Sequence, residues 1–312
     1  MNPVDIRNLG YSVQKNFWES PISLIREISL DVCESEIFGF VGPNGAGKST
    51  TIRCLLGLQR PTAGTVSLFG LRPQSKEVRS QIGYLPDSLR LASHITVDES
   101  LIFHGCKVGL AASELPVILG EYYEKLDMVS YRHKRLNELS KGMAQRVRLV
   151  QAILGTKKLL VLDEPLSGLD PVGRKLVTEL LMGLREKGTS IFFSSHILHD
   201  VEVLCDRVAV IDGGALKRVG RLEEIIDAYP ALYQLMFSGL DISKEQLKGF
   251  TTDFESSKGV CTLRFETLDT ANDCLRKLQE RGALIKRLEA IRPSLEHILW
   301  TEGVGEDGRP EA

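Results

Sequence analysis

A glycine-rich stretch between a short apolar run and a helical pattern has the composition of a phosphate-binding loop. Residues 42–49 read GPNGAGKS and follow the run IFGFV, whereas TIRCLLGL after them has apolar residues at helical spacing. Glycines let backbone N–H groups converge on phosphate oxygens, and the N-terminus of the next helix adds a positive dipole. Lys48 would pair with the β- and γ-phosphates of a nucleotide, and Ser49 would offer its hydroxyl to Mg²⁺. The nucleotide-binding residues predicted here are Gly42, Pro43, Asn44, Gly45, Ala46, Gly47, Lys48, Ser49 and Thr50.

Two adjacent carboxylates, Asp163 and Glu164, end a second apolar run. The run LLVL is short enough for a buried strand, and open α/β sheets bind ligands at the carboxyl ends of such strands. Successive side chains of a strand point to opposite faces. We therefore assign Asp163 to Mg²⁺, through its water shell, and Glu164 to polarising the attacking water. The alternative is a solvated loop pair, which the preceding apolar run and the phosphate loop disfavour.

Short apolar runs alternate with helical patterns over the first two thirds of the chain, which indicates an α/β fold. The runs IFGFV, LLVLD, SIFFSSH and RVAVIDGG are typical of buried parallel strands. The segment 64–83 is turn-rich and alternating, and it predicts antiparallel edge structure outside the main sheet. Apolar positions at three- and four-residue steps from about 96 to 154 predict a helical insertion.

Beyond residue 220 the pattern becomes that of a small α+β domain. The apolar clusters ALYQLMF, GVCTLRF and ALIKRLEAI are separated by the helical stretches ISKEQLKGF and LDTANDCLRKLQERG, a β-α-β-β-α-β order typical of a ferredoxin-like fold. The tail GVGEDGRPEA has no apolar periodicity. The expected divisions are a nucleotide-binding domain at 1–220 with a helical subdomain at about 90–155, an accessory domain at 221–300 and a flexible tail at 301–312.

The composition is that of an ordinary soluble globular protein. The 312 residues carry 39 basic and 41 acidic side chains, a formal net charge of −2, and we find no basic patch, so no nucleic acid is expected as a partner. The six cysteines are scattered without metal-ligand spacing, which is typical of a reducing compartment. MNPVDIRNLG lacks the features of a secretory signal, and no window approaches the roughly 18–20 apolar residues of a membrane span. We therefore expect a cytoplasmic chain.

Three further motifs follow in order, and together with those above they resemble the ATPase subunits of ATP-binding cassette (ABC) transporters. LSKGMAQR (139–146) is similar to the family signature LSGGQxQR, SGLD (167–170) to its D-loop, and His196 to its switch histidine. The resemblance covers the chain from about Ile6 to Gly220. It implies a P-loop NTPase core, ATP and Mg²⁺ as ligands, and ATP hydrolysis coupled to transport.

The resemblance also implies a head-to-tail pair of ATPase subunits, with each ATP between the phosphate loop of one subunit and the signature of the other. His196 would hydrogen-bond the γ-phosphate and hold Glu164 and the water in line, and Asp170 would bridge the subunits. The signature residues that would face ATP in trans are Ser140, Lys141, Gly142 and Met143. Taken alone, Ser140 is an ordinary helix N-cap and Asp170 a turn aspartate before Pro171.

Asp87 stands where most of the family carries a glutamine that touches Mg²⁺. An ionised carboxylate can ligate magnesium but cannot donate a hydrogen bond, so Asp87 is kept as a candidate metal ligand. This acid, the Lys141 and Met143 variants of the signature and the ending RPSLEHILW (292–300) resemble the branch that pairs with ABC-2-type export permeases. The resemblance therefore implies an exporter in which a homodimer of ATPase subunits sits at the cytoplasmic face of the membrane, attached through separate permease subunits.

The family stacks an aromatic ring on adenine from a position ahead of the phosphate loop. Tyr11, Phe17 and Trp18 are candidates, although Val13 stands at the best-aligned position, and we choose Tyr11. The alternative for each aromatic side chain is packing in the edge sheet.

Two other functions stay open as alternatives. Relatives that act on ribosomes or DNA carry two cassettes or a long coiled coil, whereas this chain has one cassette and no long heptad run. A nucleotide-gated regulator that scarcely hydrolyses ATP is suggested by Asp87 and opposed by Glu164.

Overall fold

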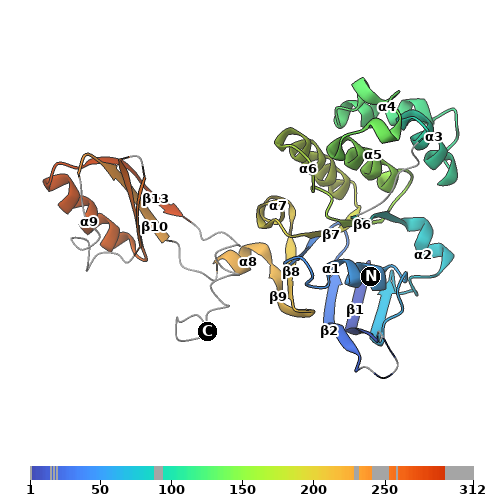
Figure 1. Cartoon of the computed structure of the whole chain (residues 1–312), viewed down its shortest axis with the longest axis horizontal. Helices are drawn as coiled ribbons and strands as arrows, with labels where there is room; N and C mark the ends of the chain where they lie inside the picture. Colours follow the sequence, from blue (N-terminus) through green and yellow to red (C-terminus); the bar gives the residue numbers. More distant parts are fainter. Residues whose placement is uncertain are drawn as a thin grey trace. The chain divides into compact units, whose positions relative to one another are not determined.

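The computed structural model divides the chain into two compact units, Met1–Leu222 and Glu223–Ala312 (Figure 1). It describes residues 2–14, 16, 18, 20–87, 94–227, 232–240, 253–257 and 259–291. Within these ranges, none of the helices has the length and apolar character needed to cross a membrane.

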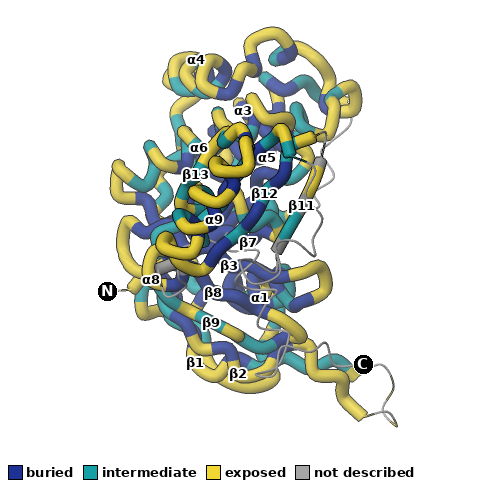
Figure 2. The backbone as a smooth tube through the Cα atoms, turned by 90° about the vertical axis from the view of Figure 1, so that its left-hand side faces the viewer, coloured by how far each residue is buried: buried dark blue, intermediate teal, exposed yellow. Residues whose placement is uncertain are grey.

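A six-stranded sheet forms the centre of the first unit. Its order is β5-β6-β7-β3-β8-β9. The first five strands in this order pair parallel with their neighbours, and β9 pairs antiparallel with β8. The strands are β3 (Ile37–Val41), β5 (Ile82–Leu85), β6 (Leu159–Asp163), β7 (Ser190–Ser195), β8 (Arg207–Asp212) and β9 (Ala215–Arg221). Every residue of β3, β6 and β7 is buried, and β3 and β7 run through the interior in Figure 2. The prediction that the four apolar runs are parallel strands is confirmed.

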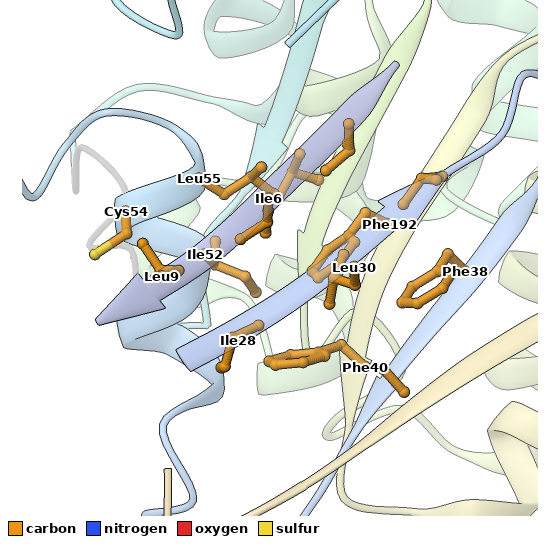
Figure 3. Packing of buried hydrophobic residues seen from close by; sticks show 14 of the residues in the cluster. Ile6, Leu9, Ile28, Leu30, Phe38, Phe40, Ile52, Cys54, Leu55 and Phe192 are labelled. Carbon is orange, nitrogen blue, oxygen red and sulfur yellow. The ribbon is translucent and has the colours of Figure 1, made fainter. Parts of the chain in front are cut away.

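A smaller antiparallel sheet covers part of this core. Its order is β2 (Ile22–Val32), β1 (Val4–Val13) and β4 (Ala63–Leu68), and helix α1 (Lys48–Leu55) contacts β2, β4 and β6. The two sheets share one hydrophobic cluster, in which Phe38 of β3 stacks on Phe192 of β7 with ring centroids 5.7 Å apart. Figure 3 shows Ile52 and Leu55 of α1 within this cluster. The helix that follows the phosphate loop therefore packs against strands of both sheets.

The first unit contains further helices besides α1. They are α2 (Lys76–Gln81), α3 (Val97–Lys107), α4 (Leu115–Lys125), the 3₁₀ turns Val129–Tyr131 and Leu136–Glu138, α5 (Lys141–Ile153), α6 (Pro171–Glu186) and α7 (Leu198–Leu204), whereas α8 (Leu222–Asp227) begins at the last residue of this unit. Helices α5, α6 and α7 contact strands of the main sheet, and α3 contacts α4 and α5. Helices α3, α4 and α5 lie together, green in Figure 1, and confirm the predicted helical insertion. Thr96 and Glu99 form a capping box at the start of α3, which fixes where that insertion begins.

The prediction for residues 64–83 is correct only in its first part. β4 belongs to the antiparallel sheet, but Lys76–Gln81 forms α2, and β5 joins the main sheet as its parallel edge. The six residues of α2 bury only Val78 and start at the N-cap Ser75, so the helix leaves no apolar periodicity in the sequence.

The second unit contains a four-stranded antiparallel sheet of order β11-β12-β10-β13. Its elements are β10 (Leu232–Ser238), β11 (Asp253–Ser257), β12 (Val260–Phe265), α9 (Leu268–Glu280) and β13 (Leu284–Ile291). The apolar face of α9 packs on β10, β12 and β13. The predicted helical stretch ISKEQLKGF, the ending RPSLEHILW and the tail 301–312 lie outside the described residues.

Candidate functional site

The loop between β3 and α1 has a geometry that requires glycine. Gly45 and Gly47 have φ angles of 85° and 106°, and a Cβ on Gly42 would lie 2.1 Å from the carbonyl oxygen of Ile211. Gly47 is the N-cap of α1, so the loop ends where the N–H groups of the first helical turn lack intrahelical partners. The predicted loop residues are thus brought to one helix N-terminus, a geometry suited to phosphate.

Lys48 turns back over this loop and reaches the end of β6. Its side chain is 7% exposed, and its Nζ donates hydrogen bonds to the carbonyl oxygens of Gly42 at 2.7 Å and Pro43 at 3.2 Å. The same Nζ lies 3.6 Å from Oε1 of Glu164. A buried ammonium group therefore stands between the phosphate loop and the predicted base.

Glu164 is held from a second direction by His196. The distance between His196 Nδ1 and Glu164 Oε2 is 2.8 Å, and the Glu164 side chain is only 12% exposed. Glu164 has a φ of 53°, in the left-handed region, and its backbone N–H donates to Ser194 on the neighbouring strand. The backbone is thus bent at the residue that carries the carboxylate, and such bends cluster at functional sites.

Asp163 lies deeper than Glu164. It is 3% exposed, and its Oδ1 accepts a hydrogen bond of 2.5 Å from Ser194 Oγ. Ser49 lies in the first turn of α1. Carboxylate and hydroxyl oxygens are the protein ligands that Mg²⁺ takes when phosphate and water supply the rest, so this pair of side chains fits a magnesium–nucleotide complex.

The signature and the D-loop contact each other within the chain. Ser140 is the N-cap of α5, and its Oγ accepts from the N–H of Met143 at 3.3 Å. A Cβ on Gly142 would lie 3.0 Å from the carbonyl oxygen of Gly168, so the glycine permits this close approach. A Cβ on Gly168 would in turn meet the Lys141 side chain at 2.8 Å.

Asp170 caps α6 and pairs with a buried arginine of α5. Its Oδ1 accepts from the N–H of Gly173 at 3.0 Å and from Nη2 of Arg146 at 3.2 Å. Arg146 also donates to the carbonyl oxygens of Leu126 and Asp127. Within the single chain, Asp170 therefore has an ordinary capping role and also links α6 to α5, the helix that follows the signature serine.

Two residues of α5 that sequence reasoning did not select connect Asp87 with Glu164. Arg148 Nη1 donates to the carbonyl oxygen of Asp87 at 3.2 Å, and its Nη2 donates to Gln145 Oε1 at 2.6 Å. Gln145 Nε2 donates to the carbonyl oxygens of Glu164 and Pro165, both at 3.1 Å. Gln145 and Arg148 are 3% and 8% exposed. Polar residues three apart on the buried face of an amphipathic helix are the signal that could have identified them.

The Asp87 carboxylate is exposed and makes no hydrogen bond or ion pair with the described residues. Burial and, after it, the carboxylate of Asp163 raise the pKa of Tyr84, and Asp87 acts in the same direction. Both carboxylates therefore act electrostatically on the phenol of Tyr84 in β5.

The Tyr11 ring packs against the hydrophobic cluster, and its hydroxyl accepts a hydrogen bond of 2.8 Å from Gln59 Nε2. Tyr11 therefore has the packing role that is the alternative to adenine stacking. Trp18 is 70% exposed, and Phe17 lies outside the described residues.

Comparison with known proteins agrees with this geometry. The family model described as ABC transporter matches residues 25–167. The ABC transporter ATP-binding protein YhaQ of Bacillus subtilis is 35% identical over 279 residues, which cover 89% of this chain and 92% of that protein. A Nod factor export ATP-binding protein I of Rhizobium etli is 35% identical over 207 residues, which cover 66% of this chain and 66% of that protein.

Solved structures show the same fold. An ATP-binding subunit of an ABC transporter is 29% identical, with a TM-score of 0.64, over 72% of this chain and 92% of that one. A dimeric ATP-binding cassette in a post-hydrolysis state with ADP and Pi has the same TM-score at 21% identity, over 70% of this chain and 98% of that one, and supports the fold alone. Because YhaQ is this similar over most of both chains, the chain belongs to the ATP-binding proteins of the ABC transporters.

Proposed function

We propose that this chain binds Mg-ATP at the phosphate loop and hydrolyses it as one of two ATPase subunits that drive a separate membrane permease. The observation that carries the proposal is Glu164, a nearly buried carboxylate with Lys48 3.6 Å from one oxygen and His196 2.8 Å from the other. A general base needs such fixed orientation toward the water that it activates. His196 holds the carboxylate, and Lys48 supplies positive charge to the β- and γ-phosphates.

Magnesium would be held by Ser49 and, through water, by the buried Asp163, with Asp87 as a further candidate ligand. When bound, it neutralises charge on the β- and γ-phosphates. Ser194 holds Asp163 in place, which keeps the carboxylate at the end of β6.

The second half of each site is proposed to come from a second copy of the chain. The phosphate loop surrounds one side of a nucleotide, and phosphoryl transfer requires charge stabilisation on the others. The N-terminus of α5, which begins after Ser140, provides such a donor. The γ-phosphate bound by one subunit would face the signature residues of the other, Ser140, Lys141, Gly142 and Met143. Asp170 would lie at the interface between the subunits.

The cargo is proposed to leave the cell through ABC-2-type permease subunits, with this chain at the cytoplasmic face of the membrane. Two relatives named Nod factor export ATP-binding protein I, each 35% identical, support this direction. Residues 1–220 would form the ATP-binding domain, with the helical subdomain at about 90–155, and residues 221–300 an accessory domain. Nucleic acid is not a proposed partner, because the net charge is −2.

Size-exclusion chromatography of Glu164→Gln with and without Mg-ATP tests this function, beside steady-state hydrolysis by the parent chain. The amide keeps the shape and loses the base, so an ATP-dependent dimer that does not hydrolyse is expected. Glu186→Gln changes an exposed glutamate at the end of α6 and should behave as the parent. Normal hydrolysis by Glu164→Gln would assign the base elsewhere, and a parent chain that binds ATP without turnover would favour the nucleotide-gated regulator.

A further inference from the structure

Helices α6 and α7 are joined by an ion pair between their first turns. Arg174 Nη1 donates to Oδ1 of Asp200 at 3.0 Å. Arg174 follows the capping Asp170 by four residues, and Asp200 follows His196 by four residues. The Arg174 and Asp200 side chains are 30% and 7% exposed, so water screens this pair less than it screens an ion pair on the surface. Neither residue belongs to the motifs of the proposed nucleotide site.

The position of Arg174 does not stabilise α6 itself. A cation in the first turn of a helix is opposed by the positive end of the helix dipole, and Arg174 lies in the first turn of α6. Burial raises the pKa of the Asp200 carboxyl, and Arg174, followed by His199 and His196, opposes that shift. Without the guanidinium, a nearly buried carboxylate would therefore lose its hydrogen-bonded counter-charge. The pair serves the connection between the two helices.

On the α6 side, the pair is fixed to the D-loop. The N–H of Arg174 donates to the carbonyl oxygen of Asp170 at 2.9 Å, and the carboxylate of Asp170 caps the same helix at Gly173. Asp170 also accepts from Nη2 of Arg146 in α5 at 3.2 Å. A movement of the Asp170 segment would therefore carry the Arg174 backbone with it.

On the α7 side, a short turn leads from the pair to His196. Ile197 is the N-cap of α7 and provides no side-chain cap. Ser195 Oγ accepts from the N–H of Ile197 at 3.0 Å and donates to its carbonyl oxygen at 3.2 Å, so the two neighbours of His196 are bonded to each other. The turn therefore ties His196 to the first turn of α7. The imidazole in turn holds Glu164 at 2.8 Å.

We propose that Arg174 and Asp200 are positioning residues of ATP hydrolysis, which couple the D-loop to the imidazole that holds Glu164. The inference rests on the proposed function, in which Glu164 is the base and Asp170 lies between the subunits. A displacement of Asp170 reaches His196 through the first turns of α6 and α7. The ion pair thereby lets the state of the subunit interface adjust the orientation of the carboxylate. Such coupling is measured by non-additive effects of substitutions along the path.

Steady-state hydrolysis of Mg-ATP by the full chain is the first test. Arg174→Met should lower kcat about tenfold, less than the roughly 100-fold cost of a 1 Å misplacement, and should leave KM for ATP within about twofold because the phosphate loop is unchanged. Arg174→Lys keeps a positive charge opposite Asp200 and should retain most of kcat. Lys175→Met is the matched control, since Lys175 is 77% exposed and pairs with Glu179 on the same helix. Equal kcat in Arg174→Met and the parent would overturn the inference.

The double variant Arg174→Met/Asp200→Asn separates positioning from stability. Arg174→Met leaves the Asp200 carboxylate without its partner and should lower Tm, whereas the double variant also removes that charge and should recover much of the lost Tm. If the pair positions His196, kcat stays low in the double variant although its Tm recovers. Recovery of kcat together with Tm would make the pair a structural contact only and overturn the inference.

The dependence on His196 is tested in the same assay. In the His196→Ala background, Arg174→Met should cause no further loss of kcat, because the path ends at the imidazole. A further loss of about tenfold in that background would show that the pair acts on hydrolysis by another route, and the inference would be wrong.

A spectroscopic measurement distinguishes failure of this inference from failure of the proposed function. The imidazole nitrogen NMR resonances of His196, recorded on the full chain at constant pH and assigned by their absence in His196→Ala, should shift in Arg174→Met and stay unchanged in Lys175→Met. Unchanged resonances in Arg174→Met, beside normal hydrolysis by the parent, would overturn this inference and leave the proposed function intact. A shift in a chain that hydrolyses no ATP would retain the link from the pair to the imidazole, but would remove the proposed function and the role of the pair in hydrolysis.

Discussion

The imidazole of His196 and the carboxylate of Glu164 meet at 2.8 Å between Nδ1 and Oε2, although 31 residues separate them in the chain. Glu164 follows β6 and His196 follows β7, and these strands are parallel neighbours, so both side chains emerge at the same edge of the sheet. The contact fixes one carboxylate oxygen and leaves the other facing Lys48.

Removal of the imidazole should therefore misplace the base, while the phosphate loop and Lys48 still bind ATP. We expect His196→Ala to lower kcat about 100-fold, because a misplacement of about 1 Å costs that much in rate. KM for ATP should change little, and steady-state hydrolysis measures both. His199→Ala is the matched control, since His199 is 79% exposed and lies on the next helix. A normal kcat in His196→Ala would show that Glu164 does not depend on this contact.

Asp170 and Arg146 should be coupled in the stability of the single chain. Asp170→Ala removes the N-cap of α6, which costs about 1 kcal/mol, and also the partner of a buried guanidinium. A double-mutant cycle with Arg146→Met, measured by urea unfolding, should give a coupling energy of about 0.5–3 kcal/mol. Asp127→Asn is the control, because Asp127 is 77% exposed and its carboxylate lies 3.8 Å from Arg146.

Additive effects of Asp170→Ala and Arg146→Met would contradict this prediction. They would leave Asp170 with its capping role and with the role proposed between subunits.

Local patterns predicted most of the fold, because the core elements carry their signals in consecutive residues. β3, the glycine loop and α1 form a continuous stretch in which apolar run, glycines and helical spacing follow one another. β11 (DFESS) and α2 lack such a signal, since β11 is polar and α2 buries a single side chain. Their places depend on the strands and helices beside them.

The candidate site was predictable in its residue types but not in its connections. Lys48, Asp163 and Glu164 stand in recognisable motifs, whereas the left-handed backbone of Glu164 appears only in the structure. The link from Asp87 through Arg148 to Gln145 joins side chains on α5 to carbonyl groups at the ends of β5 and β6. Contacts of this kind depend on how elements pack, which the sequence of one element does not determine.

Gly83 should be essential for the packing of β5 against α5. A Cβ there would lie 2.0 Å from the carbonyl oxygen of Ala152 and 2.6 Å from Leu160 Cδ2. We expect Gly83→Ala to lower the free energy of unfolding by about 1–3 kcal/mol or more, because neither the backbone oxygen nor the buried leucine can move freely. Thermal unfolding followed by circular dichroism measures the effect.

Gly120→Ala is the matched control for that substitution. Gly120 lies in α4, and a Cβ there meets nothing within 4 Å, so the same change should stabilise the chain by about 0.5–1 kcal/mol. A Tm of Gly83→Ala equal to that of the parent would contradict the close approach of β5 and α5.

Acidification should destabilise the fold through His104. Burial, followed by Lys107 and Lys157, lowers the pKa of this imidazole, and a hydrogen bond with the backbone of Gln151 opposes the shift only in part. The unfolded chain binds a proton near pH 6.5 that the folded chain resists, so the free energy of unfolding should fall as the pH drops below about 6.5 until the folded-state pKa is passed. Urea unfolding at pH 7 and pH 5.5 should show a smaller loss of stability in His104→Gln than in the parent. His199→Gln, at an exposed histidine, should lose as much stability as the parent, and an equal loss in all three proteins would show that His104 does not resist protonation in the folded state.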